Sequence, residues 1–233
     1  MKTSHHIIHQ IFKIIIFATF LFGCVEPTTT PSPDQIDKSP FTGIPCAAPC
    51  WHGLEVGKSS ERDVISTIPT LTFIDQNTVN VHQMQSMPSI NPRTSSQGIR
   101  VFANCVQPNK KCLTISVVDD ILTEIVVSLN YEFEMKEAIE YLSNPDYVGF
   151  DRAGGELVAC RVYLIWGQKQ LVLASKIFEG PNAAEKNCFM IRDTGKATGN
   201  LLVSEAQYMS VAAIEELLSS SASEFFEFTG TMP

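Results

Sequence analysis

The chain has little histidine, little tryptophan and little charge. Its 233 residues include 5 histidines and 2 tryptophans, 18% of them are charged, and the formal net charge is -8. Because an acidic surface repels a phosphate backbone, nucleic acid is not an expected partner. The 44% of hydrophobic residues is typical of a globular protein and excludes a disordered or collagen-like chain.

Common catalytic motifs are also missing. The sequence has no Gly-x-Ser-x-Gly turn, and Lys58-Ser59 lacks the glycine spacing of a phosphate-binding loop. Asp119 and Asp120 are adjacent, which is typical of a turn rather than of a catalytic carboxylate pair. We therefore expect a protein that is not an enzyme and that needs no cofactor.

The first 23 residues have the features of an export signal. Lys2 and Lys13 are followed by the apolar run 14–23, which is half as long as the roughly 20 residues that a membrane-spanning helix needs. The tetrapeptide Leu21 to Cys24 resembles the lipobox of bacterial lipoproteins. This resemblance implies cleavage before Cys24 and its modification by fatty acyl chains such as palmitate. The alternative is an ordinary secretory signal in which Cys24 is incidental.

Composition divides the rest of the chain into a spacer and a folded domain. Residues 24–45 are rich in Pro, Thr and Ser and predict an extended tether. Residues 46–233 predict a disulfide-stapled α+β domain with antiparallel sheets and covering helices. The order of its elements is also compatible with two tandem helix-plus-sheet repeats (46–130 and 131–233). Helical spacing favours helices near 60–71, 134–143 and 210–219, and strands are expected at 99–105, 112–118, 157–166 and 170–178. Residues 75–98 have no periodicity and predict an irregular excursion.

The register of the hairpin around Asp119 and Asp120 follows from its apolar residues. A two-residue loop would set Ile115 beside Glu124 on one face. A three-residue loop instead gathers these residues on one face: Leu113, Ile115, Val117, Ile121, Ile125, Val127 and Leu129. We therefore predict the three-residue loop.

Two short stretches resemble known families. The first resembles the opening of a group of uncharacterised exported bacterial lipoproteins and consists of Pro49, Cys50, Trp51, Gly53, Leu54, Gly57, Lys58, Ser59 and Val64. The second is similar to outer-membrane assembly lipoproteins of the SmpA/OmlA type and to tandem-repeat beta-lactamase inhibitor proteins, and consists of Leu142, Pro145, Asp146 and Val148. These resemblances imply an exported lipoprotein with tandem α/β repeats and assign no catalytic residue.

Six cysteines remain when Cys24 is set aside. Cys105 and Cys112 flank a predicted hairpin turn, where opposite positions lie within disulfide reach. Pairing of sequence neighbours then joins Cys46 to Cys50 and Cys160 to Cys188, although 15 pairings are possible in principle. Disulfides form outside a reducing cytosol, in agreement with export.

Metal ligation is the alternative use of some of these residues. Cys46, Cys50 and His52 are closely spaced metal-binding residue types, and His82, Met84 and Met87 resemble the His-Met-Met sets of exported copper carriers.

The leading hypothesis is a lipid-anchored, non-catalytic protein that binds an unknown envelope or extracellular protein. The alternatives are an exported copper carrier that uses His82, Met84 and Met87, and a proteinaceous inhibitor of a secreted hydrolase. The first hypothesis places the protein on a bacterial membrane, either at the cell surface or on the periplasmic face.

The lipid anchor can be tested on the protein isolated from bacterial membranes. We expect the intact mass of the mature chain to equal that of residues 24–233 plus acyl groups, with no free thiol among the other six cysteines. We expect Cys24→Ala to abolish both this processing and the added lipid mass. An unmodified mature chain that begins elsewhere would contradict the lipobox interpretation.

Overall fold

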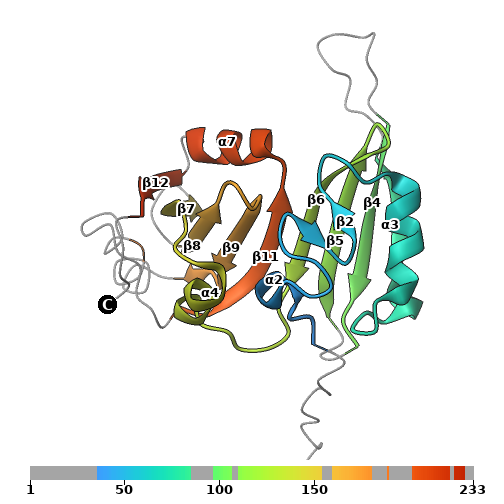
Figure 1. Cartoon of the computed structure of the whole chain (residues 1–233), viewed down its shortest axis with the longest axis horizontal. Helices are drawn as coiled ribbons and strands as arrows, with labels where there is room; N and C mark the ends of the chain where they lie inside the picture. The colour runs from blue at the N-terminus through green and yellow to red at the C-terminus, as the bar shows by residue number, and fades with distance from the viewer. Residues whose placement is uncertain are drawn as a thin grey trace, which may run out of the picture. The chain divides into compact units, whose positions relative to one another are not determined.

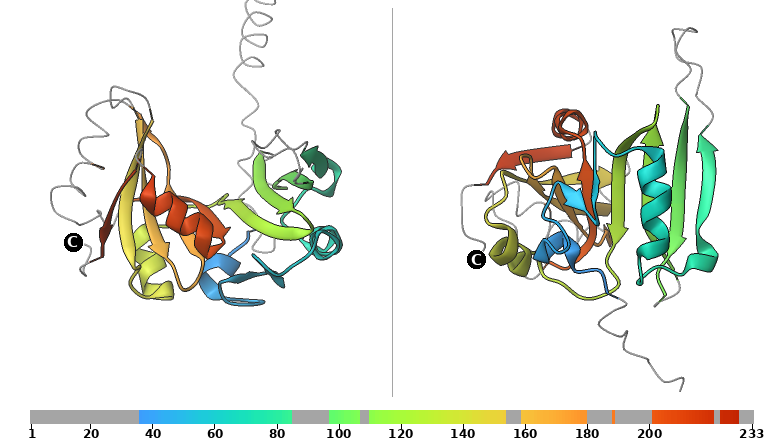
Figure 2. Two further views of the ribbon diagram at one scale, coloured as in Figure 1. Left: turned by 90° about the horizontal axis from the view of Figure 1, so that it is seen from above. Right: turned by 45° about the vertical axis from the view of Figure 1, so that its right-hand side comes forward.

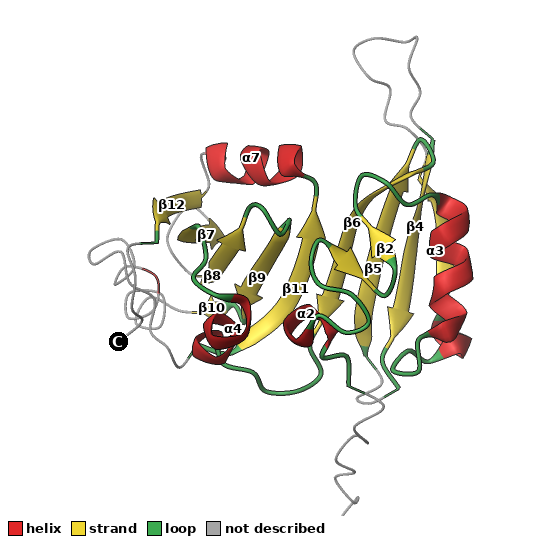
Figure 3. Cartoon of the chain, in the orientation of Figure 1, coloured by secondary structure: helices red, strands yellow, loops and turns green. Residues whose placement is uncertain are grey.

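One antiparallel sheet forms the centre of the fold (Figures 1 and 3). The structure, a computed structural model, describes residues 36–84, 97–106, 110–153, 159–179, 188, 201–220 and 223–228. The sheet has ten strands and is accompanied by a separate two-stranded hairpin and a few short helices. The fold is therefore mainly β, with fewer helices than the α+β prediction implies and with a single large sheet in place of several.

The strands and helices of the described residues have the following bounds. The hairpin is formed by β1 (Cys50–Trp51) and β2 (Leu54–Glu55). The sheet is formed by β3 (Asn80–Met84), β4 (Gly98–Asn104), β5 (Lys111–Val118), β6 (Ile121–Ser128), β7 (Tyr147–Ala153), β8 (Ala159–Trp166), β9 (Leu171–Ser175), β10 (Phe178–Glu179), β11 (Val203–Met209) and β12 (Ser223–Glu227). The α-helices are α2 (Ser39–Thr42), α3 (Glu61–Thr67), α4 (Met135–Leu142) and α7 (Val211–Ser219), and the 3-10 turns are η2 (Ile68–Thr70) and η3 (Gln76–Thr78).

Strands β6 and β11 join two runs of neighbouring strands. The order across the sheet is β12-β7-β8-β9-β11-β6-β5-β4-β3, and β10 pairs with the start of β8. Strands β3 to β6 are consecutive antiparallel neighbours, as are β7 to β9. Because β6 pairs with β11, both runs share one continuous hydrogen-bonded sheet.

The two faces of the sheet are covered differently. One face packs against α3 through Val64 and against α4 through Met135. Helices α2 and α4 lie in front of the sheet in Figure 1, and α3 lies in front of it in the right-hand view of Figure 2. On the opposite face, Ile214 of α7 packs against residues of β8 and β9 such as Ile165 and Val172. Strands β8 and β9 are apolar on both faces, whereas β4 to β6 are apolar mainly on one.

The predicted helices are present, and their ends follow from local capping. The Ser60 hydroxyl accepts a hydrogen bond from the Asp63 N–H, and the Asp63 carboxylate accepts one from the Ser60 N–H. Glu134 and Glu137 form the corresponding capping box at α4, and the Ser210 hydroxyl caps α7. These three helices confirm the sequence prediction.

In the β5–β6 hairpin the predicted three-residue loop is wrong, but the predicted placement of Ile115 and Ile125 on one face is confirmed. The turn contains two residues, Asp119 and Asp120, rather than three, so Val118 pairs with Ile121. Ile121 is 47% exposed, so the prediction that it lies on the apolar face is wrong. A β-bulge between the Ser116–Glu124 and Val117–Leu122 pairs then shifts the register by one residue. Beyond the bulge, Ile115 faces Ile125 as predicted.

The folded part begins earlier than residue 46. Helix α2 lies within the predicted tether, where the Phe41 ring stacks on Phe133 with centroids 3.8 Å apart. The predicted irregular segment 75–98 contains η3 and β3, and β7, β11 and β12 were not predicted. Residues 107–109, which include the predicted Pro108-Asn109 turn, lie outside the described residues. Among the described helices, none is long and apolar enough to span a membrane.

The burial of Phe41 predicts a large cost for its truncation. We expect Phe41→Ala to lower the free energy of unfolding of the mature protein by about 3 kcal/mol, because the side chain is 5% exposed and leaves a cavity. Ile44→Ala is the matched control, since Ile44 is 72% exposed, and it should change stability by less than about 0.5 kcal/mol. Urea unfolding measures both values. Equal effects of the two substitutions would show that α2 does not belong to the cooperative fold.

Candidate functional site

Three disulfides staple the domain with the pairing that the sequence predicts. They join Cys46 to Cys50, Cys105 to Cys112 and Cys160 to Cys188. The four cysteines of the second and third bridges are buried, whereas Cys46 and Cys50 are half-buried. The first bridge is therefore the most accessible of the three.

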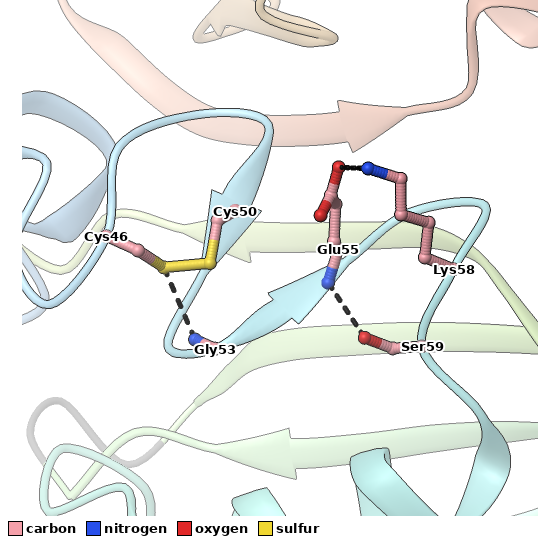
Figure 4. Close-up of a disulfide and its surroundings, with 6 residues drawn as sticks. All are labelled: Cys46, Cys50, Gly53, Glu55, Lys58 and Ser59. Carbon is pink, nitrogen blue, oxygen red and sulfur yellow. Dashed lines mark hydrogen bonds and ion pairs between the residues drawn. A yellow bond between two sulfur atoms is a disulfide. The ribbon is translucent and has the colours of Figure 1, made fainter.

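Figure 4 shows how the Cys46–Cys50 bridge closes the loop before the β1–β2 hairpin. The Gly53 N–H donates a hydrogen bond to Cys46 Sγ at 3.3 Å. On the other strand of the hairpin, the Glu55 N–H donates to Ser59 Oγ at 2.9 Å, and Lys58 forms an ion pair with Glu55. The bridge and these contacts fix the hairpin, which carries fully buried Trp51 into the core.

A buried carboxylate, Asp37, ties the start of the folded domain to this hairpin. It accepts hydrogen bonds from Trp51 Nε1 at 2.8 Å and from the Ser39 N–H at 2.9 Å. His52 Nε2 lies 3.2 Å from the same carboxylate, and the Tyr131 hydroxyl donates to the Asp37 carbonyl oxygen at 2.9 Å. Asp37 thus connects three segments that are far apart in sequence.

The charged form of Asp37 is stabilised by these donors. Burial alone raises the pKa of Asp37, but the hydrogen bonds from His52 and Ser39 outweigh it, so the net pKa lies below the ordinary value of 3.8. Burial also raises the pKa of Tyr208, whose hydroxyl has no hydrogen-bond partner among the described residues. The Asp37 cluster has the character of a structural anchor, because Asp37, Ser39 and Trp51 are buried.

The metal alternative at this hairpin is not supported by the geometry. The Cys46 and Cys50 sulfur atoms are bonded to each other and are not available as thiolate ligands. The His52 ring is hydrogen-bonded to the Asp37 carboxylate. Among the described residues, no group of three His, Cys, Asp or Glu side chains could hold a metal ion.

The face of β3 to β6 opposite α3 and α4 is the strongest candidate for a binding surface, and we call it the open face. A polar row crosses it, because the register aligns His82, Arg100, Ser116 and Glu124 on neighbouring strands. Arg100 Nε donates to Ser116 Oγ at 3.3 Å, and Ser116 Oγ donates to Glu124 Oε2 at 3.4 Å. Figure 2 allows these strands to be followed from two further directions.

Aromatic and basic side chains lie beside the polar row. Phe102 is half-buried, the His82 ring meets it edge to face at 5.6 Å, and Lys111 Nζ lies 4.1 Å from its centroid. A hollow of about 390 Å³ adjoins Lys111 at the start of β5. Its lining includes Lys110 and Lys176, and Glu205, which also lines it, is paired with Arg161 at 3.0 Å.

The copper ligands proposed from sequence are only partly described. His82 and Met84 lie two residues apart on β3, while Met87 lies outside the described residues. His82 contacts Phe102 and is the register partner of Arg100, whose positive charge disfavours a cation beside it. Cys24 also lies outside the described residues, so its acylation stays a prediction.

Comparison with known proteins gives no relative that could assign this surface. No protein-family model matches the chain, and neither a curated protein nor a solved structure matches it.

Sequence reasoning missed the open face, although a signal for it was present. In β4, apolar Ile99, Val101 and Ala103 alternate with Arg100 and Phe102. This alternation predicts that one face of the sheet packs on the core and that the other face does not. It does not show which neighbouring strands extend that second face, because the strand order is set by pairing over long distances.

The Asp37 anchor predicts a dependence of stability on pH. We expect Asp37→Asn to lower the free energy of unfolding by about 2 kcal/mol near pH 7, because an amide is a poorer acceptor for these donors. Since the folded pKa lies below 3.8, the contribution of the carboxylate is fully present above 3.8 and is lost as the pH falls through the lower folded pKa.

Urea unfolding from pH 7 downwards measures this difference. Glu140→Gln, which alters an exposed carboxyl on α4, is the control and should leave the profile unchanged. A difference between the wild type and Asp37→Asn that stays constant down to pH 2 would contradict the assignment.

Proposed function

We propose that this chain is an exported lipoprotein, anchored by acyl chains on Cys24, that binds another envelope or extracellular protein through its open face. The observation that carries the proposal is the contrast between the two halves of one sheet. On β8 and β9 this face is apolar and is covered by α7. On β4 to β6 the same face carries Arg100, Phe102 and Lys111, and no described helix packs on it.

The composition of the open face supports binding to protein. Arginine and aromatic residues are enriched at protein interfaces, and Arg100 and Phe102 lie on adjacent cross-strand rows. Strands β4 and β5 are each hydrogen-bonded to a neighbouring strand on both edges, so their backbone is rigid. Little conformational entropy is therefore lost when a partner binds this face.

A binding role fits these groups better than catalysis. The Ser116 hydroxyl lies between Arg100 and Glu124, and because Ser116 is buried, its hydroxyl is poorly accessible to a substrate. Its contacts hold the arginine and the glutamate in fixed positions across the strands.

Export is supported by the three disulfides. Such bridges persist in oxidising compartments, and two of the three are buried in the core of this domain. Together with the apolar run 14–23 and Cys24, they favour attachment to the outer side of the cytoplasmic membrane or to the outer membrane.

The domain is further proposed to contain two tandem helix-plus-sheet units. In the first unit α3 precedes β3, β4, β5 and β6, and in the second α4 precedes β7, β8, β9 and β11. Strand β6 of the first unit pairs with β11 of the second in antiparallel orientation. This repeated order favours one second candidate function, inhibition of a secreted hydrolase, which a screen of the mature protein against secreted hydrolases would test.

The main proposal is tested by crosslinking in intact envelopes of cells that produce the lipidated protein. We expect wild-type protein to give one reproducible crosslinked partner, and the pair Arg100→Glu with Phe102→Asp to reduce its yield at least tenfold. This double variant replaces the cation of Arg100 and the ring of Phe102 with acidic groups that are no larger, so it reverses the charge of this surface and removes its aromatic contact.

Glu140→Arg on α4 is the matched control, because it changes the charge of an exposed residue on a helix of the other face. The control should crosslink as the wild type does. If all three proteins capture the same partner equally, or if none captures any, the open face is not the binding surface.

A further inference from the structure

A second surface lies at the end of the sheet that α7 covers. A groove of about 680 Å³ runs between α7, the turn after β8 and the residue that follows β12. Its volume is within the range of ligand sites. Its lining includes Asp146, Gln170, Val211, Glu215, Leu218 and Glu227. None of these residues belongs to the open face.

The apolar part of the groove is formed mainly by α7. Ile214 faces the sheet and is buried, whereas Val211 is 51% exposed and Leu218 is half-buried. Val211, Ile214 and Leu218 follow helical spacing and lie on one side of this helix. The structure shows that Val211 is left uncovered by the described residues and extends the apolar surface to the groove.

The charged side chains that the structure describes in the groove are acidic. Asp146, Glu215 and Glu227 line it, and within the described part of the chain no lysine or arginine does. The nearest basic residue of the β8–β9 turn, Lys169, donates through its ammonium group to the Leu142 carbonyl oxygen and is occupied there. Asp146 Oδ2 accepts the Gly167 N–H at 2.7 Å, which fixes this carboxylate at the turn.

One acceptor at the groove is buried and unsatisfied. Gln170 lines the groove, and its Oε1 is a buried atom with no donor among the described residues. The backbone of Gln170 has φ 50°, and its N–H is bonded to the Gly167 carbonyl oxygen, so the turn holds the residue in place. A buried carbonyl oxygen without a donor costs free energy.

We propose that this groove binds a basic peptide segment of a partner protein. The aliphatic stem of a lysine or arginine side chain packs on Val211 and Leu218, and its cationic head lies among Asp146, Glu215 and Glu227. Lysine and arginine carry an apolar stem and a charged tip, which matches a surface with an apolar part and an acidic part. The net charge of -8 over the whole chain attracts such a segment at long range.

The test uses the mature protein and fluorescence anisotropy with a labelled ten-residue peptide of alternating lysine and leucine. We expect saturable 1:1 binding that weakens at least fivefold between 50 and 300 mM salt, because carboxylate–ammonium attraction is screened. The peptide with glutamate in place of lysine should not bind, and the peptide with serine in place of leucine should bind at least fivefold more weakly.

Variants locate the binding to this groove. Glu215→Lys should weaken the lysine–leucine peptide at least tenfold, and Val211→Ser at least threefold, because both residues are exposed and their replacement leaves the core intact. Glu140→Lys on α4 makes the same charge change outside the groove and should leave the affinity within twofold of the wild type.

Equal weakening by Glu215→Lys and Glu140→Lys would show that the peptide responds only to net charge and would overturn the proposal. The absence of saturable binding to the wild type would do so as well. Because Arg100→Glu with Phe102→Asp leaves the groove unchanged, that pair should bind the peptide normally, which separates this test from that of the open face.

Discussion

The pairing of β6 with β11 is the interaction on which the rest of the structure depends. It sets Val127 beside Ala206 and Ile125 beside Tyr208, and all four side chains belong to the same core. Without this pairing, each run of strands would have an exposed hydrogen-bonding edge and half of an apolar face. Backbone hydrogen bonds and shared burial therefore make one sheet out of segments that are about 80 residues apart.

The continuity of the sheet gives its two faces different uses. One face collects apolar residues from β4 to β9 and from β11 and is covered by α2, α3 and α4. The other changes character at the central strands, from the apolar β8 and β9 under α7 to the polar row that contains Arg100, Ser116 and Glu124. The open face and the groove beside α7 are thus consequences of the same alternation of side chains, since a strand presents every second residue to each side.

Sequence patterns predicted the local elements well where the deciding interactions are local. The capping box of Ser60 and Asp63 gives the start of α3, and the apolar spacing of Met135, Ala138 and Leu142 gives the buried side of α4. The hairpin around Asp119 shows the limit of this reasoning, because a bulge inside β6, and not the loop length, restores the register. Bulges depend on packing against the next strand, which a single sequence does not display.

The sequence by itself determined the apolar run before Cys24, the acidity of the chain, the three helices and the neighbour pairing of its six cysteines, since each depends on residues that are close along the chain. Only the tertiary structure decided that Asp37 anchors Trp51, that Phe41 is part of the core, and that Arg100, Phe102 and Lys111 share one face. The physical reason is that these arrangements require strand order and long-range burial. Both are settled by the joint free energy of many distant contacts rather than by any short segment.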